Sequence, residues 1–221
     1  MTFMNNDKEY NFIGNKDTIY VSLGNYCITS FLLKNANLKY ESHPYDWMVS
    51  CIDNIIHSIE NNFKEMLDSN NYESIENYTK NKFYFENIVK LFKNVSHDHQ
   101  HHNLFNEIDY NYLLRCVERF NNLHLRYNKI IFIMIIPSYI TNSILDTNKV
   151  KKLFDILVNK FGNTIKLYCF NIEEEENKVF KCNEIQNNLF IINLDTTLTD
   201  NYSMKYFCQN GIDKFINIIT S

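Results

Sequence analysis

The chain has 221 residues, of which 45% are hydrophobic and 15% aromatic, and its formal net charge is −4 at pH 7. This composition excludes a disordered protein, and the length suits one domain with a large core. The sequence contains no long basic run and no apolar run of the roughly 18 residues that a membrane span needs. We therefore expect neither nucleic acid nor a membrane among its partners.

Residues 1–16 are polar, and we expect a flexible arm there, followed by a single α/β domain over residues 17–221. The arm lacks the apolar core of a signal sequence. The six cysteines are widely scattered and include no CxxC pair, which indicates free thiols in a reducing compartment. Together these features predict a cytoplasmic protein.

The first predicted element is a buried strand over residues 18–23, which are β-branched and apolar and end at the turn signal Gly24-Asn25. Residues 28–38 have apolar side chains at helical spacing, so Cys27 lies at or just before a first helical turn. Unpaired N–H groups and the helix dipole favour a thiolate there. Cys27 is therefore a candidate nucleophile, with a buried and inert cysteine as the alternative.

Residues 38–43 are compatible with a short second strand, and Pro44 favours an extended backbone at His43. Trp47, the sole tryptophan, is expected to anchor the following loop in the core. Asp46 is harder to explain by packing. Its carboxylate either caps the next helix or orients a catalytic partner.

Residues 49–67 form a predicted amphipathic helix, residues 70–81 are polar and flexible, and residues 82–95 favour a hairpin or a strand with a turn. Next comes a cluster rich in histidine. In an extended chain His97, His99 and His101 would face one side and could bind zinc or copper. The alternative is a solvated loop, and because no fourth ligand follows at an obvious spacing we expect no metal.

The second half alternates helices and strands. A long helix is predicted over residues 107–127, with Cys116 inert on its apolar side, and later helices over residues 148–161, closed by Gly162, and 203–219. Buried strands are predicted at residues 129–136, 164–172 and 189–194, with an acidic turn at 173–176. This alternation predicts a three-layer α/β sandwich, an open, mainly parallel sheet with helices on both faces.

Two motifs carry a family resemblance: Ser-Leu-Gly-x-x-Cys at residues 22–27 and Pro-Tyr-Asp-Trp at residues 44–47. With the His97-Asp98 pair and residues 115–132, they resemble a domain family of bacteria and large DNA viruses that is classed with papain-like cysteine peptidases and is of largely unknown function. The resemblance implies a Cys-His site, and a location in the host cytoplasm if the chain is viral. Papain itself has two lobes, whereas this chain alternates, so we base the fold prediction on the alternation.

The predicted mechanism is acyl transfer or hydrolysis through a thioester on Cys27. His97 moves the proton, and Asp46 or Asp98 orients the imidazole. Backbone N–H groups around residues 24–27 hold the oxyanion. The expected substrate-binding residues are, in chain order, Ser22, Gly24, Asn25 and Trp47.

No cofactor is expected, and the substrate is a protein, a peptide or a glycan-acyl group; the oligomeric state stays open. The turn after the first strand also resembles, more weakly, that of esterases, with Ser22 or Cys27 as nucleophile, and of enzymes that modify polysaccharides. A different class of function is a noncatalytic module that binds a nucleotide or sugar. The absence of a complete GxGxxG motif weakens the dinucleotide version of that alternative.

Overall fold

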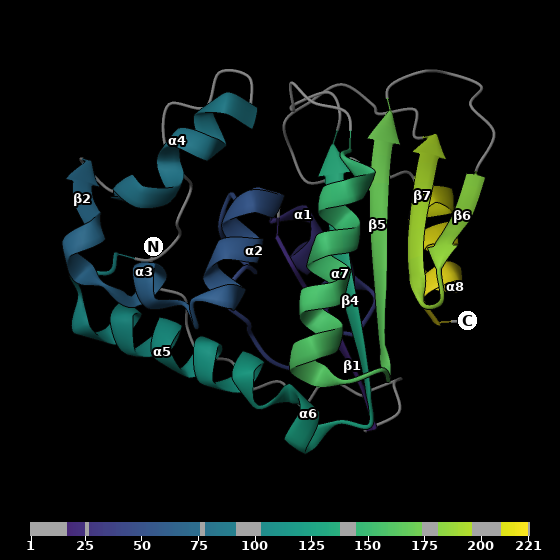
Figure 1. Ribbon diagram of the computed structural model, residues 1–221, viewed down its shortest axis with the longest axis horizontal. Helices are drawn as coiled ribbons and strands as arrows, with labels where there is room; N and C mark the ends of the chain where they lie inside the picture. Colours follow the sequence, from purple (N-terminus) through teal and green to yellow (C-terminus); the bar gives the residue numbers. More distant parts are fainter. Residues whose placement is uncertain are drawn as a thin grey trace.

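The centre of the protein is a five-stranded sheet in the order β1-β4-β5-β7-β6 (Figure 1). The computed structural model describes residues 17–24, 27–75, 78–91, 103–137, 145–173, 181–195 and 209–220. The strands are β1 (Thr18–Ser22), β4 (Lys129–Pro137), β5 (Ile165–Glu173), β6 (Lys181–Gln186) and β7 (Leu189–Asp195). β1, β4, β5 and β7 are parallel, and β6 pairs antiparallel with β7 at one edge.

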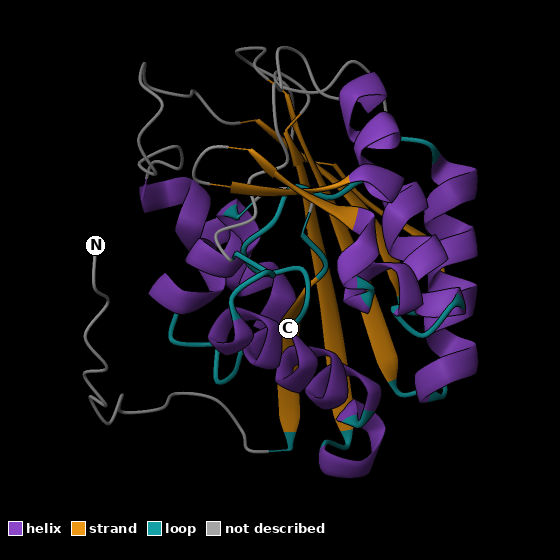
Figure 2. Cartoon of the chain, turned by 90° about the vertical axis from the view of Figure 1, so that its left-hand side faces the viewer, coloured by secondary structure: helices purple, strands orange, loops and turns teal. Residues whose placement is uncertain are grey.

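Helices cover both faces of this sheet (Figure 2). α1 (Ile28–Asn35) and α8 (Gln209–Thr220) contribute to the core on one face, and α2 (Ile52–Glu60) and α7 (Thr147–Phe161) to the core on the other. The position of β4 between the two cores explains why its sequence is apolar. Phe132 and Met134 belong to the second core, whereas Ile131 and Ile133 belong to the first, because side chains of a strand alternate between faces. The predicted three-layer α/β fold with a mainly parallel sheet is confirmed.

A further group of elements lies between α1 and β4 in the sequence and to one side of the sheet (Figure 1). Besides α2 it consists of α3 (Lys64–Leu67), the 3-10 helix η1 (Ser69–Asn71), the hairpin β2 (Tyr72–Ile75) and β3 (Tyr78–Asn81), α4 (Lys82–Leu91), α5 (Glu107–Asn121) and α6 (Leu123–Arg126). Phe120 on α5 is fully buried and connects this group to the sheet. Its ring centroid lies 5.3 Å from that of Phe63 and 5.9 Å from that of Phe132.

Several local predictions between β1 and α5 were wrong. Residues 38–43 form no strand, and residues 82–91 form the helix α4 instead of a strand or hairpin. The hairpin β2–β3 occupies a segment that was predicted to be flexible. The helix predicted over residues 49–67 is divided into α2 and α3, because Asn62 and Phe63 both have positive φ angles, of 51° and 62°.

The second half matches its prediction more closely. β4, β5, β7 and α7 lie within two residues of their predicted bounds, and Gly162 ends α7 with a φ of 88°. The prediction missed the edge strand β6; α8 is described from Gln209, and residues 203–208 of the predicted helix lie outside the described residues. The predicted arm at residues 1–16 and most of the acidic turn lie outside the described residues, and the single-domain assignment stays a prediction. Within the described ranges, none of the helices is long and apolar enough to cross a membrane.

Candidate active site

The turn after β1 is tightly packed against residues 43–50, which we call the motif segment. Gly24 has a φ of +77°, and the Ser22 hydroxyl accepts a hydrogen bond of 3.1 Å from its N–H. A Cβ atom on Gly24 would overlap the Ser50 hydroxyl and lie 3.1 Å from the Cβ and carbonyl oxygen of Tyr45. The turn therefore needs glycine for its conformation and for the close approach of the motif segment. Ser22 is itself buried and stabilises the turn.

Cys27 directly precedes α1, where the sequence predicted it, and its side chain is half-buried. Burial raises the pKa of the Cys27 thiol, and a hydrogen bond with its own backbone N–H opposes that rise without cancelling it. The expectation that the helix start favours the thiolate is therefore wrong for this thiol taken alone. Desolvation disfavours the charged form more than the nearby N–H groups favour it.

Among the other described cysteines, three are buried in the core, and burial raises the pKa of each thiol: Cys51 and Cys116 to about 11, and Cys169 further still. Cys182 is exposed on the edge strand β6, and its thiol pKa is raised by the burial that it retains and by Glu184. Cys27 and Cys182 are thus the accessible thiols of the described chain. The prediction that Cys116 lies buried on the apolar side of its helix is confirmed.

Asp46, in the motif segment, is completely buried and binds groups at both ends of α1. Its Oδ1 accepts a hydrogen bond of 2.7 Å from the Ser30 hydroxyl, in the first turn of α1. Its Oδ2 accepts one of 2.6 Å from the His43 N–H and forms an ion pair with Lys39, which follows α1. Asp46 does not cap the next helix, because the N-cap residue of α2 is Cys51.

Trp47 lies beside Asp46 and packs on the same helix. Its ring is in an edge-to-face contact with Phe31 of α1, with 5.1 Å between the centroids and an interplanar angle of 80°. Trp47 and Phe31 are both half-buried, so Trp47 packs on α1 at the margin of the core and not within the core as predicted. The two sequence motifs therefore belong to segments that pack directly against each other.

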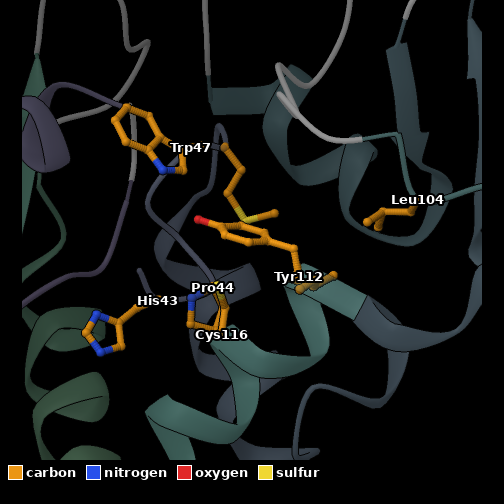
Figure 3. Close-up of a pocket in the computed structure, with 8 residues that line it drawn as sticks. His43, Pro44, Trp47, Leu104, Tyr112 and Cys116 are labelled. Carbon is orange, nitrogen blue, oxygen red and sulfur yellow. The ribbon is translucent and has the colours of Figure 1, made fainter. Parts of the chain in front are cut away.

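A small cavity of about 30 Å³ lies between the motif segment and α5 (Figure 3). Its lining includes His43, Trp47, Tyr112 and Cys116, and a space of this size holds about one water molecule. In Figure 3 the His43 ring points away from Trp47 and Tyr112. The cavity is too small for a substrate.

The three described histidines contact groups away from the start of α1. His43 Nε2 lies 3.4 Å from Glu41 Oε1, and Glu41 binds Arg126 on α6, at the end of the sheet opposite to Cys27. His57 Nε2 on α2 lies 3.2 Å from Glu65 Oε2, and the His57 ring packs at a tilt against Phe83 of α4. His124 is exposed on α6. The predicted base His97, its neighbour Asp98, the other histidines of that cluster and Asn25 lie outside the described residues.

Sequence reasoning missed two partners of Asp46. Ser30 and Lys39 were not selected, although Ser30 lies three residues after Cys27 and therefore on the same side of α1. That spacing was the available signal for Ser30. Within the described ranges, no group of three histidine, cysteine, aspartate or glutamate side chains could hold a metal ion.

The fold and the site define an α/β protein with a cysteine between its first strand and its first helix, and with a Pro-Tyr-Asp-Trp segment that packs on that helix. Residues 18–160 match the sequence model of a family described as "Putative papain-like cysteine peptidase", and the chain belongs to this family. The match extends from β1 nearly to the end of α7 and includes Cys27, Asp46 and Trp47.

The chain is also similar to an uncharacterized protein of Acanthamoeba polyphaga mimivirus. The two are 27% identical over 184 residues, which is 74% of this chain and 81% of the viral protein. The resemblance to a family found in large DNA viruses is thus confirmed. No solved structure matches the chain.

Proposed function

We propose that the protein is a cysteine hydrolase or peptidase that acts by acyl transfer through a thioester on Cys27. The observation that carries this proposal is the place of Cys27. It is a partly accessible thiol at the start of a helix, at the carboxyl edge of a parallel sheet, where such sheets bind their ligands. Among the described residues the other accessible thiol is that of Cys182, which lies within the edge strand β6 and not at the start of a helix.

In the proposed reaction the Cys27 sulfur attacks a carbonyl carbon, and the leaving group departs with a proton to give a thioester that water then hydrolyses. The first N–H groups of α1 are suited to hold the oxyanion, since helix geometry leaves them without acceptors inside the helix. The Gly24 N–H serves the turn instead, because it donates to Ser22. The oxyanion site is therefore formed at Cys27 and the residues that follow it.

The raised pKa of Cys27 means that the reaction needs a base close to the thiol. His43, His57 and His124 contact other groups, which favours a base from the cluster at residues 97–102, and we assign His97. Three donors already occupy the Asp46 carboxylate. Asp98 is therefore the better candidate for the carboxylate that orients His97.

The substrate class in this proposal is a protein, a peptide or a glycan-acyl group, so hydrolysis of an ester and transfer of an acyl group to a glycan are variants of the same chemistry. A second candidate function is a noncatalytic module that binds a nucleotide or sugar at this edge of the sheet. In that case Cys27 would not need to ionise, which agrees with the raised pKa of its thiol.

The test is turnover of an activated acyl ester, such as p-nitrophenyl acetate, by the wild type and by Cys27→Ala, His97→Ala and the matched control Cys182→Ala. We expect Cys27→Ala to abolish turnover, His97→Ala to reduce it roughly 100-fold or more, and Cys182→Ala to retain it. Circular dichroism establishes that each variant is folded. Equal turnover by the wild type and a folded Cys27→Ala variant would rule out the thioester. No turnover by the wild type, with saturable binding of a nucleotide or sugar, would favour the binding module.

A further inference from the structure

The contacts of the Asp46 carboxylate leave little of it for a catalytic histidine. The side chain is completely buried, Oδ1 accepts from Ser30, and Oδ2 accepts from the His43 N–H and from Lys39. A carboxylate accepts about four hydrogen bonds, and three are in use here. The two side chains that bind Asp46 are themselves almost completely buried: Ser30 is 0% exposed and the Lys39 side chain is 9% exposed.

These contacts connect the two ends of α1. Ser30 is in its first turn, one turn after Cys27, and Lys39 lies four residues beyond its end at Asn35. The Lys39 ammonium also donates a hydrogen bond of 3.1 Å to the Glu41 carbonyl, which fixes Lys39 in the loop between α1 and the motif segment. One carboxylate thereby fixes α1 both along its axis and in its rotation about that axis. The contact between Trp47 and Phe31 supports the same placement.

We infer that Asp46 is a positioning residue, which holds Cys27 at the carboxyl edge of the sheet by binding Ser30, and not the carboxylate that orients the catalytic base. The inference deepens the proposed function and rests on Cys27 as the nucleophile. It explains physically why the Ser-Leu-Gly-x-x-Cys and Pro-Tyr-Asp-Trp motifs occur together: the second supplies the anchor for the helix that begins with the cysteine of the first.

The direct test is Ser30→Ala, which removes the contact between α1 and Asp46 while the ion pair with Lys39 stays. Alanine is the best helix former, so α1 itself is not weakened. The matched control is Tyr72→Phe, which removes a buried hydroxyl on the hairpin β2–β3, where it donates to the Met66 carbonyl at 2.8 Å and is not part of α1 or the motif segment. Asp46→Asn is the second variant, and because it leaves Lys39 buried without its counter-ion it can lose the fold.

Two readouts are needed. The first is the rate of alkylation of Cys27 by iodoacetamide across pH, measured by peptide mapping, and the second is kcat/KM for the activated ester. Ser30→Ala frees the start of α1, so burial raises the thiol pKa less, and we expect alkylation of Cys27 at pH 7 to become about 3-fold faster or more. Misplacement of the nucleophile should lower kcat/KM about 10-fold or more. Tyr72→Phe should change neither by more than about 2-fold.

A general loss of stability would also accelerate alkylation of Cys27 and lower kcat/KM, so the buried cysteines separate the two explanations. General unfolding would accelerate alkylation of the buried Cys51, Cys116 and Cys169 together with Cys27. An unchanged alkylation profile in folded Ser30→Ala would overturn the inference. So would a folded Asp46→Asn variant in which only the base pKa of the pH–rate profile moves, since that is the signature of a carboxylate acting on the base. Alkylation is measured without turnover, so an inactive wild type would refute the proposed function and leave this test intact.

Discussion

Replacement of Gly24 by alanine should destabilise the protein by about 3 kcal/mol. Two costs add. A non-glycine residue with a φ near +77° costs roughly 1 to 2 kcal/mol, because its Cβ approaches the following carbonyl oxygen. In addition the new methyl group would overlap the Ser50 hydroxyl and press on the Tyr45 backbone at 3.1 Å, and such overpacking costs about 1 to 3 kcal/mol.

Gly162 provides a matched control for the first of these costs. It also has a positive φ, of +88°, but a Cβ there would meet nothing within 4 Å, so Gly162→Ala measures backbone strain alone. We expect about 1 to 3 kcal/mol for Gly162→Ala, because a φ of 88° with a ψ of −180° is a conformation essentially confined to glycine. The close approach of the motif segment to the turn after β1 is then reported by the coupling between Gly24 and Ser50.

Urea denaturation gives both values from the midpoint and slope of the transition. The double variant Gly24→Ala/Ser50→Ala should recover about 1 kcal/mol relative to the sum of the single variants, because the overlap with the hydroxyl is removed. Absence of coupling between Gly24→Ala and Ser50→Ala would refute the packing of the motif segment on the turn.

Three further predictions concern the core, the acid stability and the thiols. Phe120→Ala should cost about 3 to 5 kcal/mol in urea denaturation, since its fully buried ring joins α5 to the sheet; a loss below about 1 kcal/mol would contradict the described core. Burial would raise the pKa of Glu41, but contacts from His43 and Arg126 outweigh it and lower the pKa to about 2. The folded-state pKa lies below the ordinary 4.5, so this stabilisation is complete above that value and is lost as the pH falls towards 2. Arg126→Met should accordingly flatten the decrease of unfolding free energy between about pH 5 and pH 2, and an unchanged slope would contradict the assignment. In the native protein iodoacetamide should label Cys27 before Cys51, Cys116 and Cys169, which become reactive on unfolding; early labelling of a buried cysteine in peptide maps would contradict their burial.

The parts of the fold that could be predicted are those fixed by local sequence. β4 is apolar on both faces, and a strand covered on both sides needs that pattern, so its position was correct. The turn at Gly24 and the start of α1 at Cys27 also follow from nearby residues. The secondary structure between α1 and α5 could not be predicted from local sequence. The apolar residues of α4 are compatible with a strand, and Phe63 adopts a left-handed conformation that phenylalanine disfavours and that packing in the core sustains.

The same distinction between local and long-range information applies to the candidate site. Cys27 was selected because its signal is local, a cysteine after a strand and a turn. The environment of Asp46 depends on Ser30, sixteen residues away, and on Lys39, and such contacts arise from the packing of segments that the sequence alone does not place together. The predicted direction of the Cys27 pKa shift was wrong for the same reason, because burial is a property of the assembled fold.

The measurement that tests the central claim most directly is trapping of the thioester on Cys27. The protein is mixed with an activated acyl ester, quenched in acid within the first turnover, digested and analysed by mass spectrometry. The proposed mechanism predicts one acyl group on the peptide that contains Cys27, removed by hydroxylamine and absent from Cys27→Ala, with Cys182 unmodified at the same time point. An acyl group on another residue, or turnover by the wild type with no acylated Cys27 in any quenched sample and full activity in Cys27→Ala, would contradict it.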